Sequence, residues 1–367
     1  MTDEHLQRAC EEKDAGFDGW FYVGVTSTRI YCRASCPARA AKRENRRFFT
    51  TAEAAREAGF RACRRCHPDL AKRASNVTVA LSYTAPFEGE ELIAFLAARA
   101  VPAVEEVSEG IYRRSLRLPY ATGLVALRPA GGHVQATFDL DDPRDLGPAI
   151  ERCRALLDLD CDPRPIARHL RGDPLIGPEV RRAPGRRVPG HVDPHELAIR
   201  AVLGQQVSLA GARTLAGRLV AVAGERLSRP SGGVTHLFPS SEGVADGGAE
   251  RVGMPASRRR AIAGLASALA TGAIDLGAED AQQQLLSLPG IGPWTVSYIA
   301  MRALRDPDAF LATDLGIRKA LQRLGEDPSE RNAVRLAERW RPYRAAASQH
   351  LWATLTKAPA AGVQQAA

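Results

Sequence analysis

The sequence contains no long hydrophobic run. Its first residues, Met-Thr-Asp-Glu-His-Leu-Gln-Arg, lack the apolar stretch of a secretory signal peptide, and no later segment approaches the roughly 20 apolar residues of a membrane-spanning helix. No segment of the chain is repeated elsewhere, which argues against a solenoid or a propeller. We therefore expect a globular, cytoplasmic protein that does not bind membranes.

The chain also has fewer acidic than basic residues. Among 367 residues, 50 Lys and Arg exceed 42 Asp and Glu, so the net charge is +8 and the isoelectric point is near 9.3. The excess is uneven, because residues 29–73 hold 13 basic and 4 acidic side chains. Such a segment suits a polyanion, and nucleic acid is the natural candidate. The length predicts two or three domains, each with its own core.

Four of the seven cysteines form two close pairs. Three residues separate the first pair, two separate the second, and 26 lie between the pairs. In a reducing compartment, this spacing indicates a tetrahedral four-cysteine zinc site, for which a purely structural role is the simplest interpretation. The predicted ligands are Cys32, Cys36, Cys63 and Cys66. The remaining cysteines, expected to pack as ordinary apolar residues, are Cys10, Cys153 and Cys161.

A second motif begins at Leu286 and reads Leu-Ser-Leu-Pro-Gly-Ile-Gly-Pro-Trp-Thr. Gly290 and Gly292 lack a Cβ atom, so backbone N–H groups can approach a ligand there. A helix starting near Trp294 would point its positive end at the same place, which favours a phosphate. After about two turns of apolar helix, Asp314 stands at the head of the next predicted helix.

Each of these features also has a simpler interpretation. A helix–hairpin–helix occurs in proteins that only hold DNA. Asp314, preceded by Thr313, could serve only as a helix N-cap. Trp294 and Tyr298 lie four residues apart and share a helix face, but aromatic pairs at this spacing are common in cores.

Hydrophobic periodicity predicts a multidomain α+β protein. It consists of a small four-cysteine zinc α/β domain, a small antiparallel mixed α/β domain and an all-α helix–hairpin–helix core. The predicted domains are residues 1–74, 78–187 and 188–358, followed by a disordered tail at 359–367. In the second domain we expect strands at 79–83, 112–118, 123–128 and 133–140, with helices at 88–100 and 146–159. In the third we expect a long loop with a short helical piece at 227–253 and helices at 193–207, 209–223, 256–271, 280–287, 294–304, 314–324 and 329–355.

The N-terminal segment resembles the zinc domain of the Ada family. The resemblance covers roughly residues 5–70 and is carried by the run from Phe17 to Arg39 and by Glu-Ala-Gly-Phe-Arg-Ala-Cys-Arg-Arg-Cys-His-Pro-Asp, ending at Asp69. It implies that Cys32 accepts a methyl group from an alkylated DNA phosphate. Because four thiolates on Zn²⁺ carry a formal charge of −2, methylation of Cys32 should tighten DNA binding. Basic residues expected to offset that charge and to contact DNA include Arg39, Arg64 and Arg65.

Residues 78–358 resemble 3-methyladenine DNA glycosylases of the AlkA type, in the helix–hairpin–helix superfamily with a Gly/Pro-rich loop and Asp. The resemblance is carried by Phe-Leu-Ala-Ala-Arg-Ala-Val-Pro-Ala-Val-Glu from Phe95, Arg-Ala-Val-Leu-Gly-Gln-Gln-Val-Ser from Arg200, the hairpin, and His350-Leu-Trp. It implies that Asp314 stabilises an oxocarbenium sugar and directs the attacking water. The implied base pocket contains Trp294, Tyr298, Trp352 and Gln205. The implied DNA contacts are Gln206, which stands where relatives often have a Leu wedge, with Gly290, Gly292 and Thr295.

The resemblance also defines the expected chemistry. A purine alkylated at N3 or N7 is positively charged, and a cation over an aromatic face gains about 0.5–2 kcal/mol. Related enzymes that cut the DNA backbone have Lys where this chain has Trp294, so we expect a monofunctional hydrolase. No cysteine follows Cys161, which excludes the iron–sulfur cluster of some relatives. An alkali cation held by the backbone carbonyls of Leu286, Leu288 and Ile291 is implied as well.

These observations favour an alkylation-repair enzyme acting on double-stranded DNA as a monomer. Only a few residues separate the zinc segment from the glycosylase-like part, which leaves no room for the helix-turn-helix module of Ada-type activators. We therefore do not expect a transcription activator. The alternative is a non-enzymatic damage sensor, in which the zinc domain and the hairpin only hold DNA.

Overall fold

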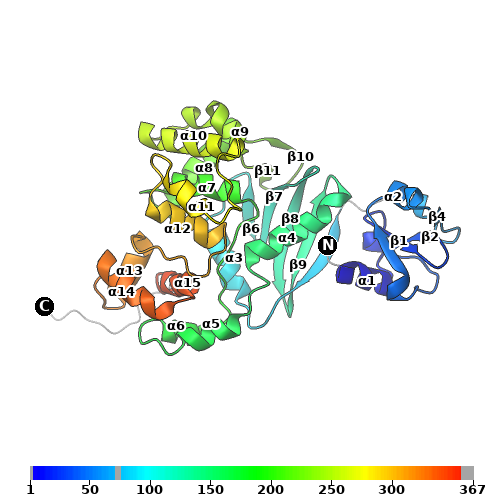
Figure 1. Cartoon of the computed structure of the whole chain (residues 1–367), viewed down its shortest axis with the longest axis horizontal. Coiled ribbons are helices and arrows are strands. Elements are labelled where there is room, and N and C mark those ends of the chain that lie inside the picture. The colour runs from blue at the N-terminus through cyan, green and yellow to red at the C-terminus, as the bar shows by residue number, and fades with distance from the viewer. Residues whose placement is uncertain (1–2, 71–75, 357–367) are drawn as a thin grey trace. The chain divides into compact units, whose positions relative to one another are not determined.

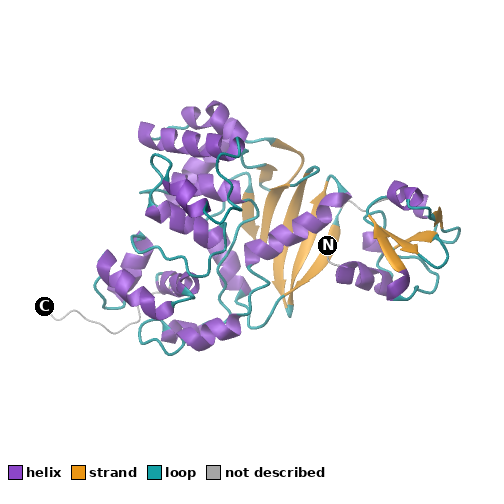
Figure 2. Ribbon diagram, in the orientation of Figure 1, coloured by secondary structure: helices purple, strands orange, loops and turns teal. Residues whose placement is uncertain are grey.

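The computed structural model describes residues 3–70 and 76–356. It separates into two compact units, one of Met1–Leu81 with Ile111–Cys153 and the other of Ser82–Gly110 with Arg154–Ala367. Figures 1 and 2 show the elements of both. Within the described ranges, no helix has the length and apolar character needed to cross a bilayer. The predicted tail at 359–367 lies outside the described residues.

The first unit contains the cysteine-rich segment, which is built on a small sheet in the order β3-β1-β2-β4. β1 pairs antiparallel with β2 and β3, and β2 pairs parallel with β4. The sheet packs on an aromatic core of Tyr22, Tyr31, Phe49 and Phe60. These strands have four residues or fewer, too short for a periodic signal, so the sequence did not predict them. The elements are α1 (Asp3–Glu12), β1 (Tyr22–Val25), β2 (Ile30–Arg33), β3 (Arg46–Phe49), α2 (Ala52–Glu57) and β4 (Arg61–Ala62).

A larger sheet in the same unit has strands in the order β5-β9-β8-β7. β7, β8 and β9 form an antiparallel meander, and side chains along β5 alternate between buried and exposed. The strands predicted at 79–83, 112–118, 123–128 and 133–140 are confirmed within a few residues. Their observed bounds are β5 (Val77–Ser82), β7 (Ile111–Arg117), β8 (Thr122–Ala130) and β9 (His133–Leu140), and α4 (Leu146–Leu157) follows β9.

The second unit is mainly helical (Figure 2). Buried side chains of α7, α8, α10 and α12 form one large apolar cluster, and those of α13, α14 and α15 belong to another. The helices are α3 (Gly89–Ala97), α5 (Pro163–Leu170), α6 (Gly177–Arg182), α7 (Pro194–Leu203), α8 (Leu209–Ala223), α9 (Ser241–Gly243), α10 (Ala256–Ala270), α11 (Ala281–Leu286), α12 (Pro293–Arg302), α13 (Leu315–Arg323), α14 (Glu330–Ala337) and α15 (Arg344–Thr354). The strands are β6 (Glu105–Ser108), β10 (Arg226–Ser231) and β11 (Val234–His236).

Three predictions for this unit are wrong. The predicted loop at 227–253 does contain a short helical piece, α9, but it also contains the β10–β11 hairpin, which turns at Gly232 with φ +58°, so the region is not all helical. The predicted helix at 329–355 is two helices. Pro342 lacks an N–H group and disfavours helical backbone in the residue before it. The predicted helix at 193–207 ends at Leu203, because Gly204 closes it and Gln206 takes a left-handed backbone with φ +53°.

Candidate functional site

The hairpin between α11 and α12 is built around two glycines with different roles. Gly290 has φ +84°, and a Cβ atom added there would lie 2.8 Å from Cβ of Ala261, so this position needs glycine for conformation and space. A Cβ at Gly292 would meet nothing within 4 Å. The backbone at Gly292 is therefore open to a ligand at the N-terminus of α12, where Pro293 occupies the first turn.

The loop that follows α7 is hydrogen-bonded to this hairpin. The side-chain amide of Gln205 donates to the Gly290 carbonyl oxygen at 3.0 Å and to the Thr295 hydroxyl at 2.9 Å. A guanidinium N–H of Arg258 donates to the Gln205 carbonyl. Thr295 is 1% exposed, and its hydroxyl accepts the hydrogen bond from Gln205.

Asp314 is both a helix cap and a residue of the cavity. As the N-cap of α13, it accepts a hydrogen bond on Oδ1 from the Ile317 backbone N–H at 2.9 Å. The same oxygen accepts from the indole N–H of Trp352 at 2.9 Å, and Oδ2 accepts from the indole N–H of Trp294 at 3.0 Å. The two interpretations of Asp314 are therefore compatible, because capping uses only part of the carboxylate.

The carboxylate lies at a cavity of about 1440 Å³ within the second unit. The hairpin, the loop after α7, and helices α3, α12, α13 and α15 all contribute to its wall. The fold thus brings together every residue that the sequence predicted for this site. Those lining the cavity are Gln205, Gln206, Gly290, Gly292, Trp294, Thr295, Tyr298, Asp314 and Trp352.

The aromatic rings of the cavity are stacked in pairs. Trp294 and Tyr298 have ring centroids 5.4 Å apart and planes inclined by 13°. Trp352 stacks on Phe95 of α3, with centroids 6.4 Å apart and planes inclined by 30°. Each ring is thus partly covered by its neighbour, and the Phe95 ring is also covered by the Arg99 guanidinium.

Two arginines that the sequence interpretation missed lie in the same wall. The Arg99 guanidinium stacks over the Phe95 ring at 3.5 Å, and burial lowers its pKa to about 10. Arg302 donates to the Tyr298 hydroxyl at 2.9 Å. Burial raises the pKa of Tyr298, but the charges of Arg302 and Arg99 outweigh this and leave it below its ordinary value. Phe95 and Arg99 lie four residues apart, as do Tyr298 and Arg302, but this spacing does not reveal burial.

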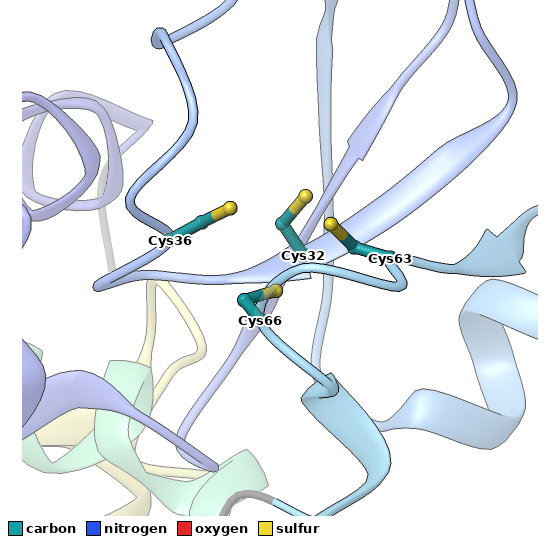
Figure 3. Close-up of side chains that lie close together, drawn as sticks. All are labelled: Cys32, Cys36, Cys63 and Cys66. Carbon is teal, nitrogen blue, oxygen red and sulfur yellow. The ribbon is translucent and has the colours of Figure 1, made fainter.

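The cysteine cluster is the second candidate site, and it lies in the first unit. One sulfur from each of the four predicted ligands lies within 4.8 Å of the others. Figure 3 shows Cys32, Cys36, Cys63 and Cys66 gathered around one point. The Cys32 thiol donates a hydrogen bond to Cys66, which lowers the pKa of Cys66 and raises that of Cys32. Four sulfurs around one point are the donor set that Zn²⁺ prefers.

Buried polar contacts support the loop between the first two cysteines. The Asp18 carboxylate accepts from the backbone N–H of Ser35 at 3.0 Å and from its hydroxyl at 2.6 Å. Arg33 forms an ion pair with Asp18 at 3.3 Å. The three predicted DNA-contacting residues of this segment, all exposed, are Arg39, Arg64 and Arg65.

A third group of possible metal ligands is a charge network. Glu105, His191 and Glu196 present donor atoms within 4.8 Å of one another. However, one nitrogen of the Arg200 guanidinium lies 3.0 Å from Glu105 and 2.8 Å from Glu196. The same nitrogen is 3.2 Å from Nε2 of His191. The cation at the centre of this group is therefore an arginine.

Comparison with known proteins gives two family matches. Residues 5–69 match the metal-binding domain of Ada, and residues 78–193 match the AlkA N-terminal domain. A probable bifunctional transcriptional activator/DNA repair enzyme AlkA from Mycobacterium tuberculosis is 37% identical over 96% of both chains. DNA-3-methyladenine glycosylase 2 of Escherichia coli is 34% identical over 75% of this chain and 96% of its own length.

Solved structures show the same fold. A 3-methyladenine DNA glycosylase from Archaeoglobus fulgidus superposes with a TM-score of 0.63 at 23% identity, covering 75% of this chain and 97% of its own. The 8-oxoguanine glycosylase/lyase of Clostridium acetobutylicum superposes with a TM-score of 0.59 at 18% identity, and the match covers 76% of this chain and 96% of its own. On the strength of the full-length sequence matches, the chain belongs to the AlkA family of DNA repair proteins and carries an Ada-type metal-binding domain before its AlkA part.

Proposed function

We propose that this protein is a monofunctional DNA glycosylase that hydrolyses the N-glycosidic bond of alkylated bases in double-stranded DNA. The observation that carries the proposal is the Asp314 carboxylate, held at the wall of an aromatic cavity beside a hairpin open to a phosphate. The names of the similar proteins, DNA-3-methyladenine glycosylase among them, support the same reaction.

The chemistry follows from the charge of the lesion. A base must leave the DNA stack to reach the cavity, and a purine alkylated at N3 or N7 is a cation with a weakened bond to the sugar. As the base departs with the bonding electrons, C1′ becomes positive, and the Asp314 carboxylate stabilises that charge. Water then attacks C1′, and its proton passes to the carboxylate or to solvent. Aromatic faces favour the cationic base by about 0.5–2 kcal/mol.

The release of free base distinguishes this enzyme from a damage sensor. We expect the wild-type protein to release 3-methyladenine and 7-methylguanine from methylated duplex DNA, detected by chromatography. Lys319 also lines the cavity, so borohydride trapping tests whether the reaction is hydrolytic. Hydrolysis predicts no covalent protein–DNA adduct. Binding to methylated DNA without any release of base would support the sensor instead.

The Ada-type segment supports a second proposed activity. Cys32 would attack the methyl carbon of a DNA methylphosphotriester, forming an S–C bond while the C–O bond breaks and its electron pair stays on the phosphate oxygen. Zn²⁺ bound by Cys32, Cys36, Cys63 and Cys66 would keep the thiols deprotonated. The exposed Arg39, Arg64 and Arg65 would contact the DNA phosphates. Mass spectrometry after exposure to methylated DNA should find one added methyl group on Cys32, and its absence would contradict this activity.

Two finer features stay proposals supported by the family resemblance. The carbonyl oxygens of Leu286, Leu288 and Ile291 would hold an alkali cation where the hairpin meets DNA, and the protein would act as a monomer. Exchange of K⁺ for a large organic cation at constant ionic strength should weaken DNA binding. Sedimentation should give the mass of one chain.

A further inference from the structure

The Asp314 carboxylate accepts hydrogen bonds from three N–H groups, and two of these belong to tryptophans on different helices. Trp294 of α12 donates to Oδ2 at 3.0 Å, and Trp352 of α15 donates to Oδ1 at 2.9 Å. The third donor, the Ile317 backbone N–H, belongs to the first turn of α13. Both carboxylate oxygens are therefore held, and from different directions.

The Trp294 indole is fixed by contacts that do not involve Asp314. Its face stacks on Tyr298, and the Tyr298 hydroxyl accepts from Arg302. Arg302 is anchored in turn, because its guanidinium donates to the carbonyl oxygens of Pro189 and Gly190 at 2.8 and 2.9 Å.

The Trp352 indole is fixed in a similar way. Its face stacks on Phe95, and its edge lies against Gly316 in the first turn of α13. A Cβ atom at Gly316 would lie only 2.9 Å from the indole Cδ1 and Nε1 atoms. Glycine at this position therefore allows the indole N–H to reach the carboxylate. The two donors are set by the fold and do not depend on Asp314 for their positions.

Neutral donors affect a carboxylate differently from a cationic partner. An ion pair would fix the carboxylate but would also cancel much of the charge that must stabilise a positive sugar. Indole and amide N–H groups hold the oxygens while the group keeps its full negative charge. Within the described residues, the hydrogen-bond donors of Asp314 are neutral, and the nearby charge of Arg99 acts on the carboxylate without a direct ion pair.

We propose that Trp294 and Trp352 are positioning residues, whose indole N–H groups hold the Asp314 carboxylate toward C1′ of the extruded nucleotide. Their role thus extends beyond aromatic contact with the base. The inference rests on the proposed function of Asp314. It predicts that the N–H group of each tryptophan contributes to the chemical step separately from its ring.

An isosteric substitution separates the N–H group from the ring. Trp294 or Trp352 is replaced by 3-benzothienylalanine, in which sulfur takes the place of the indole N–H and the aromatic faces remain. A hydrogen bond to a charged group is roughly twice as strong as one between neutral groups, so the single-turnover rate of 7-methylguanine release should fall about 10-fold or more at each position. The dissociation constant for lesion DNA should stay within about twofold. An unchanged rate in both variants would overturn the inference.

Trp340 provides a matched control. Its indole N–H donates to Oδ2 of Asp173 at 3.0 Å, but neither residue lines the cavity. The same substitution at Trp340 should lower the melting temperature without changing the rate of base release. An equal loss of rate at Trp340 would show general destabilisation and would overturn the inference.

A measurement without turnover distinguishes failure of this inference from failure of the proposed function. In ¹⁵N NMR spectra, Asp314→Asn should shift the indole N–H signals of Trp294 and Trp352 while leaving that of Trp340 in place. Unchanged signals would overturn the inference even if the wild-type protein releases base. If the signals shift but the wild-type protein releases no base, the hydrogen bonds exist and the proposed function is wrong.

Discussion

At the scale of single residues, the site depends on the two indole N–H groups that donate to the oxygens of the Asp314 carboxylate. Asp314, Trp294 and Trp352 could be selected from their motifs, and all three line one cavity. Their motifs could not show that both indoles direct their N–H groups at the carboxylate, because that depends on how α12, α13 and α15 pack. Arg99 was missed because it is separated from Asp314 by over 200 residues and its burial is a tertiary property.

A buried histidine gives a prediction about pH. Nδ1 of His350 lies 2.9 Å from a guanidinium nitrogen of Arg186, and burial followed by that positive charge lowers the pKa of His350 to about 3. The ordinary pKa of histidine is 6.5, so unfolding takes up a proton between these values. Stability should therefore fall as the pH drops below about 6.5, by at most about 1.4 kcal/mol per pH unit from this group.

Replacement of the histidine tests this contribution. His350→Gln cannot be protonated, so the difference in unfolding free energy between variant and wild type should shift in favour of the variant as the pH falls from 6.5 toward 4. Urea unfolding at a series of pH values measures that difference. A difference that does not vary with pH would show that His350 is not held neutral in the folded protein.

At the scale of elements, predictions succeeded where a segment was long and periodic. The strands of the larger sheet and helices such as α8 and α10 were predicted to within a few residues. The short strands around the cysteines and the β10–β11 hairpin were not, because few residues carry their pattern. The break between α14 and α15 could have been predicted from Pro342.

The hairpin glycines give a prediction with an internal control. Gly290→Ala places a side chain on left-handed backbone and against Ala261, so it should lower the free energy of unfolding by about 1–3 kcal/mol. The Cβ atom added by Gly292→Ala has no protein atom within 4 Å, so this variant should change the free energy of unfolding by less than about 0.5 kcal/mol.

DNA affinity should be affected more by Gly292→Ala than its stability is. The methyl group of Gly292→Ala would project into the space proposed for a phosphate, so the dissociation constant for duplex DNA should rise several-fold. Fluorescence anisotropy at fixed salt measures it. Full DNA affinity in Gly292→Ala would show that the phosphate does not approach the hairpin there.

At the scale of the whole molecule, the metal-binding segment and the glycosylase cavity have separate apolar cores. Both parts could be predicted from the sequence because each contains its own motif, the four cysteines in one and the hairpin with Asp314 in the other. The segment around the cysteines has a small aromatic core, so metal binding should supply much of its folding free energy.

Removal of zinc from the intact protein tests whether the cavity folds and acts independently of the metal-binding segment. A chelator should abolish one thermal transition and methyl transfer to Cys32, while the single-turnover rate of base release changes by less than about twofold. Calorimetry and base-release assays on the same sample provide the comparison. Loss of base release in proportion to lost zinc would show that the cavity depends on the metal-binding segment.

The central claim is that the charge of Asp314 drives base release. Asn is also a good N-cap, so Asp314→Asn keeps the start of α13 while it removes the charge and one of the two acceptor oxygens, the one that faces Trp294. The most direct test is the single-turnover rate of 7-methylguanine release by Asp314→Asn, measured together with its affinity for the same duplex. The account predicts a rate about 10²–10⁴-fold below that of the wild type with DNA affinity retained. A variant that releases base at the wild-type rate would contradict it.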